Sequence, residues 1–297
     1  MLKKILKYLD KHIYLVLLAP FMILSIIFTL IPIINSFYIS FFDFSFLNPS
    51  KRSFVLLDNF KAVLTDDVFL TALKNTLLFV VVFVLAEMFL SLIVAVLLNA
   101  KIKYSNLYKT LIYLPYVVTP IAIGGIISQL FKKNSSLVLF LAKFGFENVT
   151  WNSTAPYAFW LVLLIVIWTQ LGFFMVIYIS AIKEIPEELY EAAEIDGANS
   201  FKKFRYITYP LLKNTRTLIL FMCLLVSFQL FDLPYLISTI GGTSPGTPNN
   251  TTMTLVMYIY ANAFRYNNMG LATAASVILF IIIFILSFVQ NKLGERS

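Results

Sequence analysis

Six long stretches of the chain are almost wholly apolar, and shorter polar segments separate them. A helix needs about 20 apolar residues to cross the roughly 30 Å hydrocarbon core of a bilayer. The pattern therefore predicts an all-α membrane protein, with one six-span domain over residues 13–292 after a tail at 1–12. The expected spans are residues 13–34, 76–98, 107–131, 157–182, 217–239 and 271–290.

Two of these stretches contain features that are unusual for a membrane-spanning helix. The first follows a basic lead, as signal peptides do, but its apolar run exceeds the roughly 7–15 residues of a signal core, and no small-x-small cleavage pattern follows promptly. It is therefore expected to stay in the protein as a span. The third contains Pro115 and Pro120, which membrane helices tolerate where neighbouring groups satisfy the freed carbonyls.

The composition excludes several classes of protein. Hydrophobic residues make up 60% of the 297 residues and charged residues 13%, whereas soluble domains average about 45–50% and about 25%. A lone soluble enzyme, a disordered tail and a nucleic-acid binder are therefore excluded, despite the net charge of +8. The single Cys and the single His (His12) exclude a disulfide framework and a two-histidine metal motif, so neither a catalytic residue nor a metal ligand is expected.

The distribution of Lys and Arg predicts how the spans are oriented. With the amino terminus inside, the cytoplasmic segments hold 15 of the 23 Lys and Arg residues, and the outer segments hold eight. Cytoplasmic loops of membrane proteins carry an excess of these residues. Both termini are therefore expected in the cytoplasm, as an even number of spans requires.

The predicted cytoplasmic loop over 183–214 differs in composition from every other loop. Of the 38 charged residues in the chain, 12 fall between Lys183 and Arg216, six of each sign. The residues alone leave two interpretations open, a solvated connector between spans and a docking element for a cytoplasmic partner.

The same loop carries start and stop signals for two short helices. Pro186 suits the first position of a helix, and Gly197 suits the residue just past its end. Asn199 or Ser200 suits the cap of a second helix, and Pro210 is expected to mark the next break. Helices this short are marginal in water, so we expect packing to hold them.

The spacing of residues in this loop resembles the EAA motif of binding-protein-dependent ABC importer permeases. That motif is Glu-Ala-Ala, three residues, Gly, nine residues, Ile, one residue and Leu-Pro. It is matched here by Glu191, Ala192, Ala193, Gly197, Ile207 and Pro210, with Tyr209 in place of Leu. Phe228-Gln-Leu-Phe-Asp232, Gly241-Gly242 and Thr254-Leu-Val-Met-Tyr-Ile-Tyr260 are similar to maltose-type carbohydrate permeases, and to the first of their two permease subunits more than the second. The resemblance covers residues 10–292.

This resemblance implies a MetI-like permease fold in a prokaryotic cytoplasmic membrane. The loop would be seated in a cleft of an ATP-hydrolysing subunit, with Glu191 as its charged anchor and with Asp196 and Gly197 at the turn. The implied partners are a second homologous permease, two ATP-binding subunits, an extracytoplasmic sugar-binding protein and membrane lipid. The chain has no Gly-x-x-x-x-Gly-Lys-Ser/Thr motif, so ATP and Mg would be bound by a partner, and this chain is expected to be no enzyme and to hold no cofactor.

Polar residues within the predicted spans are candidates for a sugar path, because polar groups are costly in a bilayer. Gln229 and Asp232 are three residues apart and are expected to share a helix face beside Phe228. An amide, a carboxylate and a ring suit the hydroxyls and C–H faces of a sugar. Further candidates are Trp168, Gln170, Gly172 and Phe173 in the fourth span and Tyr113, Tyr116 and Gln129 in the third. Each of these residues could instead serve helix packing, which is the role that we favour for Glu87.

Three other functions were weighed against an importer permease. An ion-gradient-driven secondary transporter of a small polar solute would have internal repeats, broken helices and a buried charge relay, and no clear repeat is present. A membrane-embedded enzyme would need a catalytic set, but His12 and Cys223 each stand alone. A receptor or scaffold would leave the EAA spacing unexplained.

Overall fold

The computed structural model describes residues 14–15, 17–100, 103–132, 134–145, 157–239 and 244–295. The tail at 1–12, His12 and Gly241-Gly242 lie outside the described residues. The chain divides into two compact units, each described by itself. The smaller is Met1–Thr65 with Ile259–Phe280, and the larger is Asp66–Tyr258 with Ile281–Ser297.

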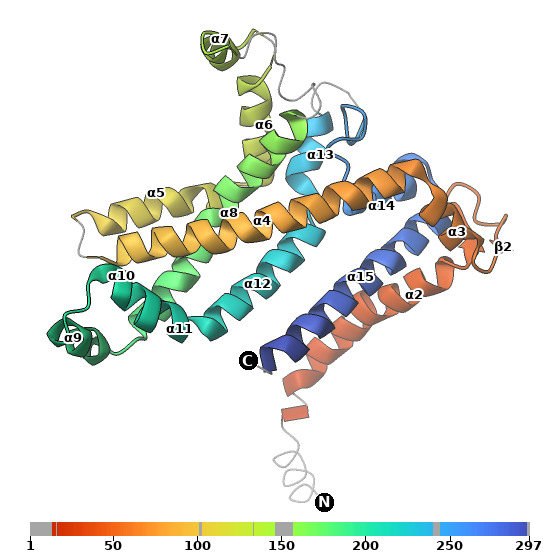
Figure 1. The fold of residues 1–297 in the computed structure, drawn as a ribbon. Helices are drawn as coiled ribbons and strands as arrows, with labels where there is room; N and C mark the ends of the chain where they lie inside the picture. Colours follow the sequence, from red (N-terminus) through yellow and green to blue (C-terminus); the bar gives the residue numbers. More distant parts are fainter. Residues whose placement is uncertain are drawn as a thin grey trace, which may run out of the picture. The chain divides into compact units, whose positions relative to one another are not determined.

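The smaller unit contains the first long helix and the first half of the last. The helix Leu17–Ile39 includes a π-helical turn, η1 (Ile26–Leu30), before α2 (Ile31–Ile39). A short antiparallel hairpin of β1 (Phe42–Asp43) and β2 (Ser53–Phe54), which the sequence did not predict, leads to α3 (Asp58–Thr65). The π-helical turn η3 (Ala261–Arg265) precedes α15 (Met269–Glu295), which lies beside α2 (Figure 1).

A glycine allows the hairpin to lie directly on the start of α15. The backbone N–H groups of Met269 and Gly270 donate to the carbonyl oxygen of Phe44, at 2.9 and 3.2 Å. The Asn59 side-chain amide donates to the carbonyl oxygen of Phe42 at 2.9 Å. A Cβ atom on residue 270 would overlap both that carbonyl and the Asn59 amide, so this close approach requires glycine.

Three long helices form the core of the larger unit. They are α4 (Asp67–Asn99), α8 (Tyr157–Lys183) and α12 (Lys213–Phe228), and each packs against the other two (Figure 1). Around them, α5 (Ser105–Val117) packs on α8, and α13 (Asp232–Thr239) packs on α6 (Pro120–Leu130). The unit also contains α7 (Ser136–Ala142) and most of α14 (Leu255–Tyr260).

Hydrogen bonds tie the segment before α14 to the first turns of α4. The side-chain amide of Asn75 donates to the carbonyl oxygens of Asn250 and Met253, at 2.8 and 3.1 Å. The backbone N–H of Leu255 donates to Thr76 Oγ1 at 3.1 Å. Because these polar groups bond within the protein, the irregular segment remains compatible with a place beside an apolar helix.

Among the described residues, five helices are long and apolar enough to cross a membrane. They are Leu17–Ile39, Asp67–Asn99, Tyr157–Lys183, Lys213–Thr239 and Met269–Gln290, where Lys213–Thr239 comprises α12 and α13. A sixth span is present only if α5 and α6 are counted together, and these two helices are bent by 93°.

The expectation of one helix over residues 107–131 is therefore wrong. The backbone is extended at Val118 and Thr119, with ψ angles of 135° and 140°. Thr119 precedes Pro120, whose ring disfavours the helical conformation in the residue before it. Pro115, in contrast, stays inside α5, so only one of the two prolines accompanies the break.

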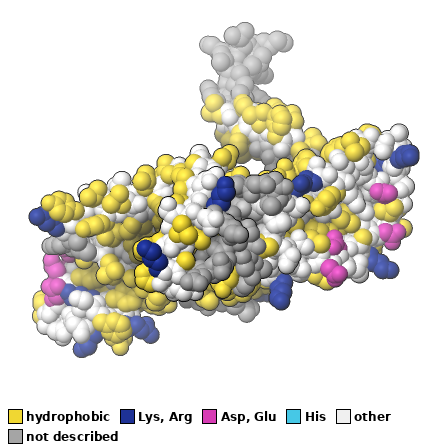
Figure 2. Space-filling view, turned by 90° about the horizontal axis from the view of Figure 1, so that it is seen from above, with side chains coloured by type: hydrophobic (Ala, Val, Ile, Leu, Met, Phe, Trp, Pro, Cys, Tyr) yellow, Lys and Arg dark blue, Asp and Glu magenta, His cyan; other side chains and the backbone are white. Residues whose placement is uncertain are grey.

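Apolar side chains cover much of the surface. Figure 2 shows hydrophobic side chains spread widely over the described part of the visible face, with charged side chains in separate places. In the helix Leu17–Ile39, the most apolar 18-residue window contains no buried residue. Soluble monomers rarely expose contiguous apolar patches of this extent, so the surface fits a membrane environment.

Candidate functional site

The charged loop, residues 183–214, folds into short helices as the sequence predicted. It contains α9 (Glu187–Ile195), α10 (Ser200–Lys203), the π-helical turn η2 (Phe204–Thr208) and α11 (Tyr209–Leu211). Asn199 caps α10, because its side-chain oxygen accepts the N–H of Lys202 at 2.9 Å. Gly197 follows the end of α9 with φ +74°, which is the conformation that favours glycine at this position. Pro186 is the cap of α9 and not its first helical residue.

The expected break at Pro210 is wrong. Pro210 lies inside α11, and helical backbone continues from Ser200 to Leu211. The preceding π-helical turn explains this, because the Tyr209 N–H bonds to the carbonyl of Phe204, five residues earlier. The wider turn accommodates the proline ring, which would clash with a carbonyl in an ordinary α-helix. The break occurs two residues later, at Leu212.

Side-chain contacts close this loop into a folded unit. The hydroxyl groups of Tyr190 in α9 and Thr208 in η2 are hydrogen-bonded at 2.9 Å. Lys203 of α10 forms an ion pair with Glu194 of α9, although Glu194 is largely exposed and the pair adds little stability. The two helical parts of the loop are thus joined to each other, which argues against an open connector.

The residues of the motif and its turn are largely accessible on this folded loop. Glu191, Ala192, Asp196 and Pro210 are exposed, and Ala193 and Ile207 are half-buried. Three apolar side chains that the motif does not include are also strongly exposed, namely Ile195 (88%), Phe201 (72%) and Tyr206 (74%). Apolar groups exposed on a folded, charged loop indicate an interaction surface.

Two candidates of α8, Trp168 and Gly172, lie in different environments. Trp168 is 51% exposed and lines a cavity of about 500 Å³ whose other walls are apolar side chains of α6, α7 and α8. Gly172 is buried against α5, where a Cβ atom would overlap the carbonyl oxygen of Ile112 and the Cα of Tyr113. The close approach expected of Gly172 is therefore an approach between two helices.

Three aromatic candidates meet where α5 packs on α8. Phe173 is stacked on Tyr116, with ring centroids 4.8 Å apart and an interplanar angle of 18°. The ring of Tyr113 lies 5.5 Å from that of Tyr116, which is itself 38% exposed. Gln170 lies three residues before Phe173 on the same face of α8 and is half-buried. The structure therefore brings together residues that the sequence placed in two separate spans.

The expected shared helix face of Gln229 and Asp232 is wrong, because the helix is interrupted between them. Gln229 is the cap just past the end of α12, and Asp232 begins α13. The carbonyl of Leu230, between them, accepts the hydroxyl of Thr254 at 2.8 Å. Gln229 and Asp232 are exposed at this break, whereas Phe228 is only 2% exposed and packs inside the protein.

Two further polar candidates differ in burial. Gln129 is exposed on α6. Glu87 is fully buried in α4, and neither of its carboxylate oxygens has a hydrogen-bond partner in the described part of the chain. The helix-packing role favoured for Glu87 thus has no hydrogen bond to support it.

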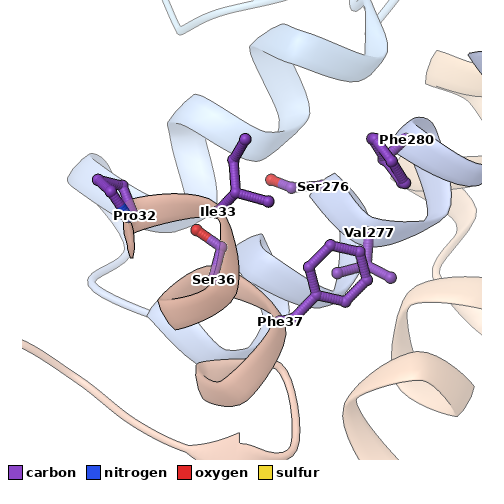
Figure 3. A pocket seen from close by; sticks show the side chains of 7 residues that line it. All are labelled: Pro32, Ile33, Ser36, Phe37, Ser276, Val277 and Phe280. Carbon is purple, nitrogen blue, oxygen red and sulfur yellow. The ribbon is translucent and has the colours of Figure 1, made fainter. Parts of the chain in front are cut away.

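A cavity in the smaller unit is a poor candidate for a sugar site. It lies between α2 and α15, has a volume of about 240 Å³, and contains the hydroxyls of Ser36 and Ser276 among apolar side chains (Figure 3). The Ser276 hydroxyl already donates to the carbonyl oxygen of Ala272 at 2.9 Å. Sites for polar ligands need several convergent polar groups, and this cavity lacks them.

Long apolar helices joined by a folded, charged loop are typical of a polytopic membrane protein. A model of the family described as "binding-protein-dependent transport system inner membrane component" matches residues 87–296, and the chain belongs to this family. The resemblance recognised from the loop motif is therefore confirmed.

Relatives and solved structures agree with this assignment. The chain is 32% identical to the arabinooligosaccharides transport system permease protein AraP of Bacillus subtilis (strain 168), over 93% of this chain and 86% of that one. It is 33% identical to the probable starch degradation products transport system permease protein AmyD of Thermoanaerobacterium thermosulfurigenes, over 95% and 94%. A bacterial ABC transporter involved in the import of alginate has the same fold, with a TM-score of 0.86 and 22% identity over 99% of both chains. The MetI-like permease fold is thus confirmed.

Broken helices do not separate the importer from the ion-gradient transporter. They are expected in an ion-gradient-driven transporter, yet here α5 and α6 are bent by 93° and α12 is interrupted before α13. Family membership decides the class instead, because the relatives named above are permease proteins of transport systems.

Proposed function

We propose that the chain is the transmembrane permease subunit of an ATP-driven sugar importer in a prokaryotic cytoplasmic membrane. It forms half of the translocation path, and a second homologous permease forms the other half. Two partner subunits bind ATP and Mg, and an extracytoplasmic protein delivers the sugar. The names of the relatives support a sugar as cargo, since they include transporters of arabinooligosaccharides and starch degradation products.

The folding of the charged loop is the observation that carries this proposal. A coupling element must move as one piece when its partner moves, and the bond between Tyr190 and Thr208 joins the two helical parts of the loop. It must also expose side chains that a partner subunit can contact. Glu191 offers a charge and Ile195 an apolar side chain, both exposed on α9.

Replacing Glu191 by Ala tests this role. In the assembled complex, reconstituted in liposomes with the sugar-binding protein, we expect Glu191→Ala to lower sugar-stimulated ATP hydrolysis about tenfold or more. The reason is that removing one charge from a desolvated interface costs more than the about 1.4 kcal/mol that corresponds to a tenfold effect.

Glu184→Ala is the matched control for this experiment. Glu184 is also an exposed glutamate of the charged loop, but it precedes α9. We expect its substitution to leave stimulated hydrolysis near the wild-type rate. Equal rates for Glu191→Ala and the wild type would remove the docking role from α9.

For the sugar path we propose two groups of side chains. Tyr116 and Phe173 offer a stacked aromatic surface with Gln170 nearby, and rings of this kind pack against the C–H faces of sugars. Gln229 and Asp232 offer exposed hydrogen-bonding groups at a break between helices, where backbone groups are free of helical pairing.

Substituting Asp232 tests the second group. We expect Asp232→Ala to raise the KM for sugar uptake about tenfold, because a hydrogen bond between a charged group and a sugar hydroxyl contributes about 1.5–3 kcal/mol. Asp67→Ala is the control, since Asp67 is likewise an exposed aspartate at the first position of a helix. An unchanged KM in Asp232→Ala would exclude this residue from the path.

A further inference from the structure

A helix break at Leu212 separates the charged loop from α12, and backbone hydrogen bonds continue across it. Leu212 lies between α11 and α12 (Figure 1), with a ψ angle of 9°, and its side chain is only 1% exposed. Its N–H donates to the carbonyl oxygen of Thr208 at 3.1 Å, and its carbonyl oxygen accepts the N–H of Arg216 at 2.8 Å. The buried side chain and these two bonds hold the backbone at the break.

A cation–π contact between two side chains spans the same break. The guanidinium carbon of Arg216, in the first turn of α12, lies 3.7 Å from the centre of the Tyr209 ring in α11. Such contacts extend to about 6 Å, so this one is close. We call Tyr209 and Arg216 the bridging pair, because one lies on each side of Leu212.

The positive charge of Arg216 lies in an unfavourable place. The side chain is half-buried, its Nε atom is enclosed without a hydrogen-bond partner, and it forms no ion pair within the described part of the chain. The first turn of α12 contains no acidic residue, and a cation at a helix start opposes the helix dipole. Because such a charge is costly, the contact with the Tyr209 ring matters for keeping Arg216 in this position.

Tyr209 is also the position at which the charged loop departs from the EAA motif, which has Leu there. A leucine side chain has no aromatic face for a cation. The departure from the motif therefore coincides with the contact to Arg216. Arg205 lies near the same ring as well, but it is exposed and its guanidinium carbon is 5.9 Å from the ring centre.

Thr208 joins the bridging pair to α9. Its side chain is 5% exposed, and its hydroxyl is hydrogen-bonded to that of Tyr190 in α9 at 2.9 Å. Thr208 directly precedes Tyr209, and its carbonyl oxygen accepts the N–H of Leu212. A displacement of α9 would thus reach α12 through a short series of direct contacts.

We propose that the bridging pair makes the charged loop and α12 move together, so that a displacement of α9 by the ATP-binding partner reaches the spanning helix. Without the pair, the backbone bends at Leu212 and the displacement stays within the loop. This inference rests on the proposed importer function, and it makes Tyr209 and Arg216 positioning residues for the coupling.

The number of sugar molecules transported per ATP hydrolysed tests the proposal in the reconstituted complex. We expect Tyr209→Leu and Arg216→Met each to lower this ratio about fivefold or more, the lower end of ordinary allosteric coupling, while ATP hydrolysis continues. Tyr209→Phe keeps the aromatic ring and is expected to keep the wild-type ratio. Arg205→Met is the matched control, because it removes an exposed charge that lies further from the same ring.

The double variant shows whether the two residues act as one unit. Residues that act through a shared contact have non-additive effects, so we expect Tyr209→Leu combined with Arg216→Met to lower the ratio no further than the single variants. Copurification of the ATP-binding subunits measures assembly, which is expected to be unchanged in every variant. Multiplied effects in the double variant, or lost assembly in both single variants, would show that the pair has only a structural role.

The same measurements separate this inference from the importer function. If Glu191→Ala uncouples the complex but Tyr209→Leu and Arg216→Met keep the wild-type ratio, the proposal for the bridging pair is wrong and the importer function stands. If the wild-type complex shows no sugar-stimulated hydrolysis, both fall.

Discussion

Gly172 and Gly125 both lie inside apolar helices, yet their surroundings give them opposite roles. A Cβ atom on Gly172 would overlap backbone atoms of α5, whereas a Cβ atom on Gly125 would have no atom within 4 Å. Backbone atoms cannot rotate out of the way as a side chain can. Gly172 is therefore required for the packing of α5 on α8, and Gly125 is not.

We accordingly expect Gly172→Ala to destabilise the purified protein in detergent by about 1–3 kcal/mol, the usual cost of overpacking. Gly125→Ala should be neutral or stabilising by up to about 1 kcal/mol, because alanine favours a helix over glycine. Denaturation of the two variants, side by side with the wild type, measures the difference. Equal stability of the two variants would show that α5 and α8 do not meet closely.

Residues whose role depends on local backbone conformation were predictable from the sequence. Gly197 was expected just past the first short helix and is found there with φ +74°. Asn199 or Ser200 was expected as the cap of the second, and Asn199 is the cap. The lack of hydrogen bonds to Glu87 was not predictable, because it depends on which side chains α8 and α12 bring to α4. The same applies to the stacking of Tyr116 on Phe173 across two helices.

At the scale of elements, the apolar pattern predicted where helices occur but not where they break. The break before α6 accompanies Pro120 and could have been suspected, yet Pro115 has the same chemistry and leaves α5 intact. The interruption after α12 involves Thr254, a residue 24 positions away from its partner Leu230. Long-range contacts of this kind leave no periodic signal in the sequence.

The short helices of the charged loop, in contrast, were predicted from the sequence, because the residues that start and end them are close together in the chain. A proline, a glycine and a cap residue predicted two short helices, and α9 and α10 were found. The continuation of helical backbone through Pro210 was missed, since a π-helical turn has no sequence signature that the spacing reveals. The loop could therefore be recognised from its motif before its full shape was known.

At the scale of the whole molecule, the low fraction of charge predicted a membrane protein, and the family assignment agrees. The orientation of the termini remains a prediction from the Lys and Arg distribution. It places the charged loop in the cytoplasm, where an ATP-hydrolysing partner would meet it, and the segment around Ser244 on the opposite side. Both sites have exposed residues, so both accept a chemical probe.

Contact between α9 and the ATP-binding partner is the most direct test of the importer function. A photoreactive maleimide can be attached to Ala192→Cys, with Ser244→Cys as the control, since the only native thiol, on Cys223, is buried. Illumination of the intact complex is expected to link residue 192, but not residue 244, to the ATP-binding subunit. No link from residue 192, or equal links from both positions, would contradict the proposed coupling.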